Sequence, residues 1–418
     1  MPSNSKNIAE LLNTDTTIAV TDVADGSITT AKLAADAVTA AKLADNAVVT
    51  ASVADGAVTQ VKTTGVGRGK NIIINGAMQM AQRGASGTTN GYTSLDRWIN
   101  GYGGGTVTQS QQALTSGSPY NEGHRNFLRA TNTAAGSTAA TDSLQIYQVI
   151  ESQNLATSGW DSTSSSSFIT VSAWVRSSLA GTYNLRLYIY DGDKNYTSPI
   201  VLSANTWTKV TKTIPGAAGN TVNNDNGAGM FVNFAVHLGT NNTVASGFTN
   251  NQWATFDTAS QATDYAQNWR STGSATFDVT GVQLEVSSSA TDFEHRSFGE
   301  ELALCQRYYE EINVTGYFVT GNSYSTAQFN ASPMFFKTKK RSTPNITFPA
   351  IGNTSGTIGP TNATANYVTL GSVLRSYASP DWFQIYNNSG DGYSGFTDDG
   401  VMQIYSYGTT TITASSEL

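Results

Sequence analysis

The sequence from Asp25 to Lys62 reads DGSITTAKLA, ADAVTAAKLA, DNAVVTASVA and DGAVTQVK, so one ten-residue pattern recurs along it. Within and just before this stretch an apolar residue occupies every fifth position: Ile18, Val23, Ile28, Leu33, Val38, Leu43, Val48, Val53 and Val58. A period of five fits neither the α-helix nor the β-strand. On a strand, an odd period would place successive apolar residues on opposite faces, so we expect a bend or a change of conformation within each pentad.

This repeat predicts a stalk that is built from several identical chains. One repeat cannot bury its apolar stripe within itself, and burial of the stripe does not offset the entropy lost on ordering so long a backbone. Identical chains around one axis bury the stripe most economically, so we expect an intertwined homotrimer over residues 18–64. Two alternatives are a disordered Ala/Thr/Asp-rich linker and a single-chain pentapeptide coil, which would complete few turns for a solenoid.

The composition indicates β-rich domains and disfavours several classes of partner. The 418 residues suffice for two to four domains. Charged residues make up only 13% and glycine occurs 39 times, and short apolar runs between Gly/Asn/Ser turns are typical of all-β domains. The net charge of −7 disfavours nucleic acid and anionic membranes as partners. Cys305, the single cysteine, rules out an intrachain disulfide, and no apolar run is long enough for membrane insertion.

The first residues are expected to attach the chain to a larger assembly. Residues Met1–Lys6 contain no basic segment followed by an apolar one, so we expect no secretory signal. Residues 1–17 include a candidate helix with Ile8, Leu11 and Leu12 on one face. A helix this short is marginal alone, so it would dock on a partner as an anchor. The alternative is a frayed terminus.

Residues 65–297 alternate short strands with polar loops and are predicted to form a jelly-roll β-sandwich. Two segments show the alternation of apolar and polar residues most clearly. Their apolar faces consist of Val171, Ala173 and Val175 in the first segment and of Leu185, Leu187 and Ile189 in the second.

This pattern resembles the jelly-roll sandwiches of carbohydrate-binding modules. The resemblance is carried by VSAWVR (171–176), LRLYIY (185–190), WTKV (207–210) and FDVTGVQLE (277–285). It implies a sandwich of the kind that binds sugars, but it carries over no ligand-binding residue.

Residues 298–313 are predicted to form a connecting helix. Ser297 and Glu300 make the capping box Ser-x-x-Glu at its start. One continuous helical face consists of Phe298, Leu302, Cys305, Tyr309 and Ile312. Three such helices around a threefold axis would form a collar. Residues 314–418 again contain strand patterns and fit one small β-sandwich, which would be the tip.

Together these segments resemble bacteriophage tail fibre proteins, above all those of marine and cyanobacterial phages. The resemblance is carried by the decads, NIIINGAM (71–78), GVQLEV (281–286), FEHRS (293–297), EELALCQRYY (300–309) and SEL (416–418). It implies a homotrimer that is fixed through its N-terminus to the phage tail or an adaptor protein. It also implies a location in the virion tail, extracellular after lysis, and host attachment through the C-terminal end. The long N-terminal adaptor-binding domain of larger fibres has no counterpart here.

Sugar binding requires aromatic rings beside planar polar groups, because rings stack on the apolar faces of sugars while amides and carboxylates bind hydroxyls. Two sets of residues fit this need: Trp382, Tyr386, Asp391 and Tyr393 in the tip, and Trp174, Arg186, Tyr188 and Tyr190 in the middle domain. The tip is favoured because binding residues gather on loops of a rigid scaffold. The expected receptor is a host cell-surface polysaccharide or lipopolysaccharide. The alternative is that these aromatic residues pack in sandwich cores or trimer interfaces.

The sequence favours binding over catalysis. Its histidines, His124, His237 and His295, lie far apart in the sequence, and neither His-Glu-x-x-His nor Gly-x-Ser-x-Gly occurs. We therefore expect no enzyme activity, no cofactor and no metal, although Asp191–Asn195 could offer oxygens to calcium instead of forming a plain hairpin turn. Two other functions stay open: a head fibre or decoration protein with a purely structural role, and a tailspike that degrades glycans with two carboxylates.

Overall fold

The computed structural model describes residues 69–136, 139–362 and 370–418. The predicted anchor (1–17) and stalk (18–64), with the stripe from Ile18 to Val58, lie outside the described residues. The described residues are mostly β-strands with a few short helices, as the sequence predicts. They contain two large, separate apolar cores, one within residues 73–284 and one within residues 314–412.

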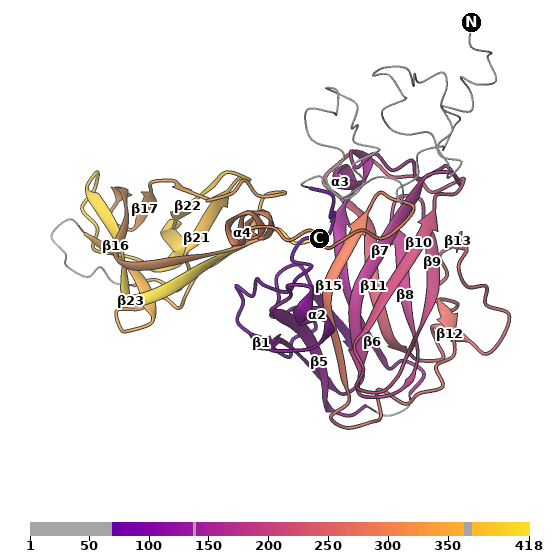
Figure 1. Ribbon diagram of the computed structural model, residues 1–418. Helices are drawn as coiled ribbons and strands as arrows, with labels where there is room; N and C mark the ends of the chain where they lie inside the picture. Colours follow the sequence, from indigo (N-terminus) through magenta and orange to yellow (C-terminus); the bar gives the residue numbers. More distant parts are fainter. Residues whose placement is uncertain (1–68, 137–138, 363–369) are drawn as a thin grey trace, which may run out of the picture. The chain divides into compact units, whose positions relative to one another are not determined.

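The first core lies between two β-sheets. The six-stranded sheet has the order β1 (Ser86–Gly87), β4 (Thr106–Ala113), β5 (Asn126–Ala134), β15 (Thr276–Glu285), β7 (Phe168–Ser177) and β10 (Thr208–Pro215). The seven-stranded sheet has the order β13 (Trp253–Thr255), β9 (Lys194–Leu202), β8 (Gly181–Ile189), β11 (Ala228–Leu238), β6 (Ser143–Glu151), β3 (Ile99–Gly103) and β2 (Gly91–Tyr92). Figure 1 shows the strands of these sheets running side by side. All strand pairs within both sheets are antiparallel.

The residues that the alternation of apolar and polar side chains predicts to face inward are buried in this core. Val171, Ala173 and Val175 of β7 are buried, and so are Leu185, Leu187 and Ile189 of β8. Trp98 and Trp269 are fully buried in the same cluster. The intervening side chains of each strand point away from the core, so the sandwich presents two polar outer faces.

Small elements complete the sandwich. Two short strands, β12 (Thr243–Val244) and β14 (Ala262–Thr263), pair in parallel in the segment between β11 and β15. Two short helices are α2 (Ser118–Asn121) and α3 (Ser152–Ala156).

The connecting helix is shorter than the sequence pattern predicts. Helix α4 runs from Phe298 to Gln306 and begins with the predicted capping box of Ser297 and Glu300. Tyr309 and Ile312, predicted on the same helical face, instead lie in strand β16 (Tyr309–Ser325). Phe298 is 63% exposed, whereas Cys305 is buried. The helix ends because residues 309–314 pair with residues 410–415 of another strand. Backbone hydrogen bonds between the two strands replace those within the helix.

The second core is covered by one large sheet. Its order is β18 (Met334–Phe335), β22 (Trp382–Tyr386), β17 (Gln328–Ala331), β16, β23 (Val401–Ser415) and β19 (Asn345–Thr347). Two further strands pair onto it, β20 (Thr357–Asn362) on β23 and β21 (Arg375–Ala378) on β22. Its core includes Phe329, Phe383, Ile385, Ile404 and Ile412.

Buried ion pairs connect residues that are remote in sequence. The guanidinium of Arg97 donates to Glu417, which also accepts from Arg83 at 3.0 Å. Arg307 makes a two-fold contact with Glu151 at 2.8 and 2.9 Å. Because these carboxylates are nearly inaccessible to water, their interactions are weakly screened. Among the described helices, none has the length and apolar character needed to cross a membrane.

We predict that Glu417→Gln lowers the free energy of unfolding by about 3 kcal/mol, because it leaves the buried Arg97 cation without its anion. Urea unfolding of the full chain measures this change. Lys339→Gln is the control: Lys339 and Asp381 form an exposed pair at 3.3 Å, and such pairs contribute about 1 kcal/mol or less. If both variants lose the same free energy of unfolding, the buried pair contributes no more to stability than the exposed one.

Candidate functional site

The outward face of the seven-stranded sheet carries a set of polar and aromatic side chains, here called the sheet face. Antiparallel registry places Arg186 of β8 opposite Asn233 of β11, and Asn233 opposite Tyr147 of β6. Two residues along the same strands, Tyr188 lies opposite Phe231. Residues paired in this way point to the same side of a sheet, so these side chains gather at its centre.

A hydrogen-bond network occupies the centre of the sheet face. The amide oxygen of Gln145 accepts from Arg186 Nη1 at 3.0 Å and from Asn233 Nδ2 at 2.6 Å. Arg186 Nη2 donates to Asn195 Oδ1 at 3.1 Å. Within the described part of the chain, Arg186 Nε and Asn233 Oδ1 find no hydrogen-bond partner. A donor and an acceptor therefore stay unpaired on two adjoining strands.

Aromatic rings flank this network. The ring of Tyr188 lies 5.4 Å from that of Phe231 and 4.6 Å from that of Phe256, and Tyr190 lies 6.2 Å from Tyr188. Tyr190 is 56% exposed. Tyr147 lies 5.8 Å from Phe231 on the other side.

The structure brings together three of the four middle-domain candidates and separates the fourth. Arg186, Tyr188 and Tyr190 belong to one strand and its end, whereas Trp174 lies on β7 of the six-stranded sheet. There its indole nitrogen donates to Glu122 Oε2 at 2.9 Å and it is nearly buried. Trp174 therefore has a packing role on the opposite face.

A pocket of about 360 Å³ adjoins the network at the edge of the sheet. Asn195 lines it together with Phe248, Trp253 and Asp257. Because Asn195 also accepts from Arg186, one side chain connects this pocket with the centre of the sheet face.

A second group of aromatic residues lies on the outward face of the C-terminal sheet and is here called the aromatic face. The rings of Tyr377 and Tyr386 are stacked, with centroids 4.3 Å apart and planes 9° from parallel. Phe335 is paired with Trp382 across β18 and β22. Phe335 is 75% exposed and Tyr377 56% exposed, while Trp382 and Tyr386 are half-buried. Polar neighbours in register are Arg375, Asn330 and Gln384.

The other two tip candidates have structural contacts. Asp391 accepts two hydrogen bonds from Arg375, at 2.9 and 2.8 Å, and one from the Asn388 backbone at 2.7 Å. The bond from Arg375 lowers the pKa of the Asp391 carboxyl. Tyr393 is buried in the second core, and burial raises the pKa of its hydroxyl. Of the predicted tip set, Trp382 and Tyr386 therefore remain available to a ligand, and the sequence analysis missed Tyr377 and Phe335.

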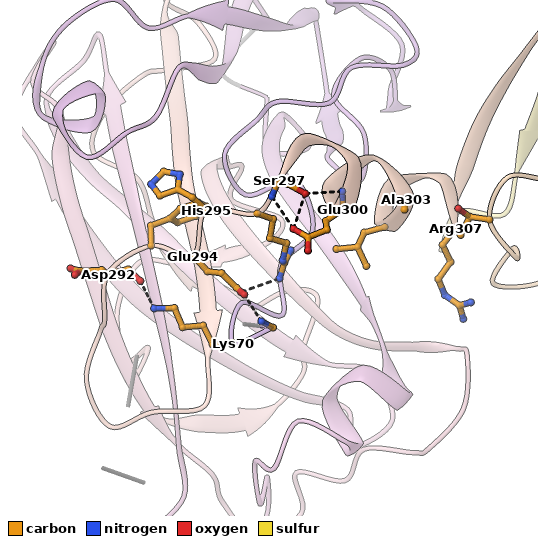
Figure 2. Close-up of a pocket in the computed structure, with 13 residues that line it drawn as sticks. Lys70, Asp292, Glu294, His295, Ser297, Glu300, Ala303 and Arg307 are labelled. Carbon is orange, nitrogen blue, oxygen red and sulfur yellow. Dashed lines mark hydrogen bonds and ion pairs between the residues drawn. The ribbon is translucent and has the colours of Figure 1, made fainter. Parts of the chain in front are cut away.

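A pocket of about 930 Å³ lies beside the start of α4. Figure 2 shows the residues that line it. Its polar groups bind one another: Glu294 accepts from the Asn71 backbone at 2.8 Å and pairs with Arg296 at 3.4 Å. Lys70 donates to Thr291 at 2.7 Å. These contacts join residues that precede and follow the sandwich, so we interpret this pocket as part of a structural joint.

The histidines also have structural surroundings. His295 Nε2 lies 2.9 Å from the carbonyl of Glu122, and its ring is 5.3 Å from that of His124. His124 packs against Gly281, whose φ of +61° falls at a bulge in β15 where a Cβ would collide with the imidazole. Burial, followed by the charge of His295, lowers the pKa of His124 to about 4.

The loop considered for calcium is occupied by hydrogen bonds. Asp191 accepts from the Asn223 backbone at 2.8 Å, from the Asn223 amide at 2.9 Å and from Ser152 at 3.1 Å. Over residues 69–136, 139–362 and 370–418, His, Cys, Asp and Glu form no group that could hold a metal ion.

No family model matches the chain, and no curated protein matches it. Among solved structures it is similar to a family 11 carbohydrate-binding module from Clostridium thermocellum in complex with a β-1,3-1,4-mixed-linked tetrasaccharide (12% identity, 50% of this chain and 98% of that chain, TM-score 0.23). It is also similar to a putative sugar binding protein from Bacteroides thetaiotaomicron (12% identity, 52% and 100%, TM-score 0.27) and to an exo-β-agarase (11% identity, 52% and 25%, TM-score 0.26).

We predict that the chain loses stability as the pH falls from about 6.5 to 4. Burial also lowers the pKa of His237 to about 4, so both histidines stay neutral in the fold while the unfolded chain binds protons. Burial raises the pKa of Asp96 to about 6, so the fold binds a proton there below pH 6, which opposes this loss. The two histidines outweigh this single carboxyl group.

His124→Gln should flatten the pH dependence of the melting temperature between pH 6.5 and 4, and so should His237→Gln. Thermal unfolding followed by circular dichroism measures both slopes. A wild-type slope retained in both variants would contradict the assignment to these histidines.

Proposed function

We propose that this chain is the subunit of a homotrimeric bacteriophage tail fibre that binds a carbohydrate on the host surface. The observation that carries the carbohydrate part is the aromatic face, where Phe335, Tyr377, Trp382 and Tyr386 share one side of one sheet. Exposed clusters of this kind mark interaction sites on soluble proteins.

The chemistry of the aromatic face suits a saccharide. The flat pair of Tyr377 and Tyr386 offers ring faces to the C–H groups of a pyranose. Asn330 offers its amide to hydroxyls, and Gln384 offers its amide oxygen, since its amide nitrogen donates to the Ala331 carbonyl. The carboxylate of Asp391 is paired with Arg375, so Asp391 is not available to bind a sugar hydroxyl.

The fibre part of the proposal rests on the sequence. The five-residue stripe from Ile18 to Val58 is best buried between copies of the chain. Three copies would present three sites on one stalk, and their combined affinity would exceed that of one site. The proposed role is adhesion and not hydrolysis.

Carbohydrate binding is tested with the full chain on host surface polysaccharide and on a glycan array. Tyr377→Ala and Trp382→Ala should each weaken binding two- to tenfold, equivalent to about 0.5–1.5 kcal/mol for a lost aromatic contact. Tyr317→Ala is the matched control, because Tyr317 is 50% exposed in the same sheet but lies beside Tyr405 on β16 and β23.

Two results would contradict the proposal. Silence of the wild-type chain across host glycans would favour a purely structural virion protein. A change in oligomeric mass caused by Tyr377→Ala, with no change in binding, would make the aromatic face a contact between copies.

Trimerisation is tested by light scattering of the full chain, with an expected mass three times the 44.2 kDa of one chain. Leu33→Asp together with Leu43→Asp should shift the mass towards one chain, because a carboxylate in the buried stripe is strongly unfavourable. Thr39→Asp, at a position outside the stripe, should leave the mass unchanged. A wild-type mass of a single folded chain would refute the stalk.

A further inference from the structure

We infer that the sheet face holds a second saccharide site, in which Arg186 takes the anionic group, a carboxylate or a sulfate ester, of an acidic sugar. This inference rests on the proposed carbohydrate binding for the class of ligand. It concerns other residues than the aromatic face, so each can fail without the other.

Arg186 differs from the other buried arginines in its surroundings. Arg97 pairs with Glu417. Among the described residues Arg270, like Arg186, has no carboxylate within ion-pair distance, but the charge of Asp142 raises the pKa of Arg270 against the effect of burial, and no carboxylate does so for Arg186. Arg186 is only 4% exposed, and among the described residues no carboxylate lies within ion-pair distance of it. A buried cation without an anion is unfavourable, so this position favours binding of an anionic group.

A neutral side chain occupies the place where a counter-ion would be expected. The amide oxygen of Gln145 accepts from both Arg186 and Asn233, at 3.0 and 2.6 Å. A carboxylate or sulfate oxygen at this point would accept the same two bonds with a full negative charge. Gln145 is only half-buried, so its amide can be displaced by a ligand from the outward side.

The neighbours of Arg186 fit the remainder of a sugar. Tyr188, Phe231 and Tyr147 surround the network with half-exposed rings. The unpaired Asn233 Oδ1 can accept from a hydroxyl, and Arg186 Nε can donate to a ligand oxygen. Asn195 continues the polar surface into the adjoining pocket of about 360 Å³.

The acid–base state of Arg186 agrees with this geometry. Burial lowers its pKa to about 10, and the hydroxyl of Tyr265 opposes that fall only in part. The guanidinium is therefore still charged at neutral pH, and its charge acts in surroundings of low dielectric constant. An arriving anion would meet a rigid, planar donor whose position is fixed by Gln145 and Asn195.

Calorimetric titration of the full chain tests the inference with two matched pairs of probes. Oligogalacturonate is compared with its methyl ester, and a sulfated dextran oligomer with the unsulfated oligomer. We expect each charged member to bind at least tenfold more tightly than its neutral counterpart. The pair that shows the larger difference distinguishes carboxylate from sulfate recognition.

Two variants locate the site. Gln145→Glu places a carboxylate beside Arg186, so it should abolish binding of the charged probe and raise the melting temperature. Arg186→Gln removes the charge and should weaken binding at least tenfold. Lys209→Gln is the control, because it removes a positive charge from the six-stranded sheet, where Lys209 pairs with Glu122. Trp382→Ala should leave this binding unchanged.

The outcomes are decisive even if Arg186→Gln fails to fold, because Gln145→Glu is nearly isosteric and tests the same position. Equal affinity for charged and neutral probes would overturn the inference. So would full binding by a folded Gln145→Glu variant, or inorganic sulfate that binds as tightly as the sulfated oligomer. Loss of glycan binding in Trp382→Ala, with oligogalacturonate binding intact, would support two separate sites.

Discussion

Burial of a charged side chain is tolerated only where an opposite charge or a full set of hydrogen bonds meets it, and this constraint shapes the described fold. Arg97 meets Glu417, and Arg307 meets Glu151. On the outer face of the six-stranded sheet, Asp278 meets both Arg129 and Arg176, at 2.8 and 2.7 Å. Each pair joins elements distant in sequence, so the ionic contacts add to the strand ladders and loop contacts that hold these elements together. Arg186 meets this rule least well, because no carboxylate counters the effect of its burial, and we connect that exception with binding.

Much of the sandwich follows from local pattern. Alternation in β7 and β8 identifies the inward residues because a strand has only two faces, and both sets are buried. The capping box of Ser297 and Glu300 marks the start of α4 for a similarly local reason. The end of α4 does not follow, because Tyr309 and Ile312 satisfy a helical period yet pair with β23, some hundred residues later in the chain. Helical spacing alone cannot detect such a partner.

The two candidate binding faces are predictable in part from the sequence. Trp382 and Tyr386 alternate with buried Phe383 and Ile385, so their outward position is visible in the sequence. Tyr377 and Phe335 join them only through the pairing of β21 and β18 with β22, which no spacing reveals. Gln145 and Tyr147 did leave a signal, because they alternate with Leu144 and Ile146 in one short run. Trp174 alternates with the inward Ala173 and Val175, but its strand β7 belongs to the other sheet, which no local pattern reveals.

The contact between Arg97 and Glu417 spans 320 residues of sequence. During synthesis at roughly 5–20 residues per second, Arg97 is incorporated on the order of 16–64 s before Glu417. The strands around Arg97 can pair in that interval, but until Glu417 is made its guanidinium has to stay hydrated or donate to another acceptor. Formation of this ion pair is therefore a late event in the biogenesis of the chain, and the nascent sandwich passes through an interval in which the Arg97 cation has no anion to neutralise it.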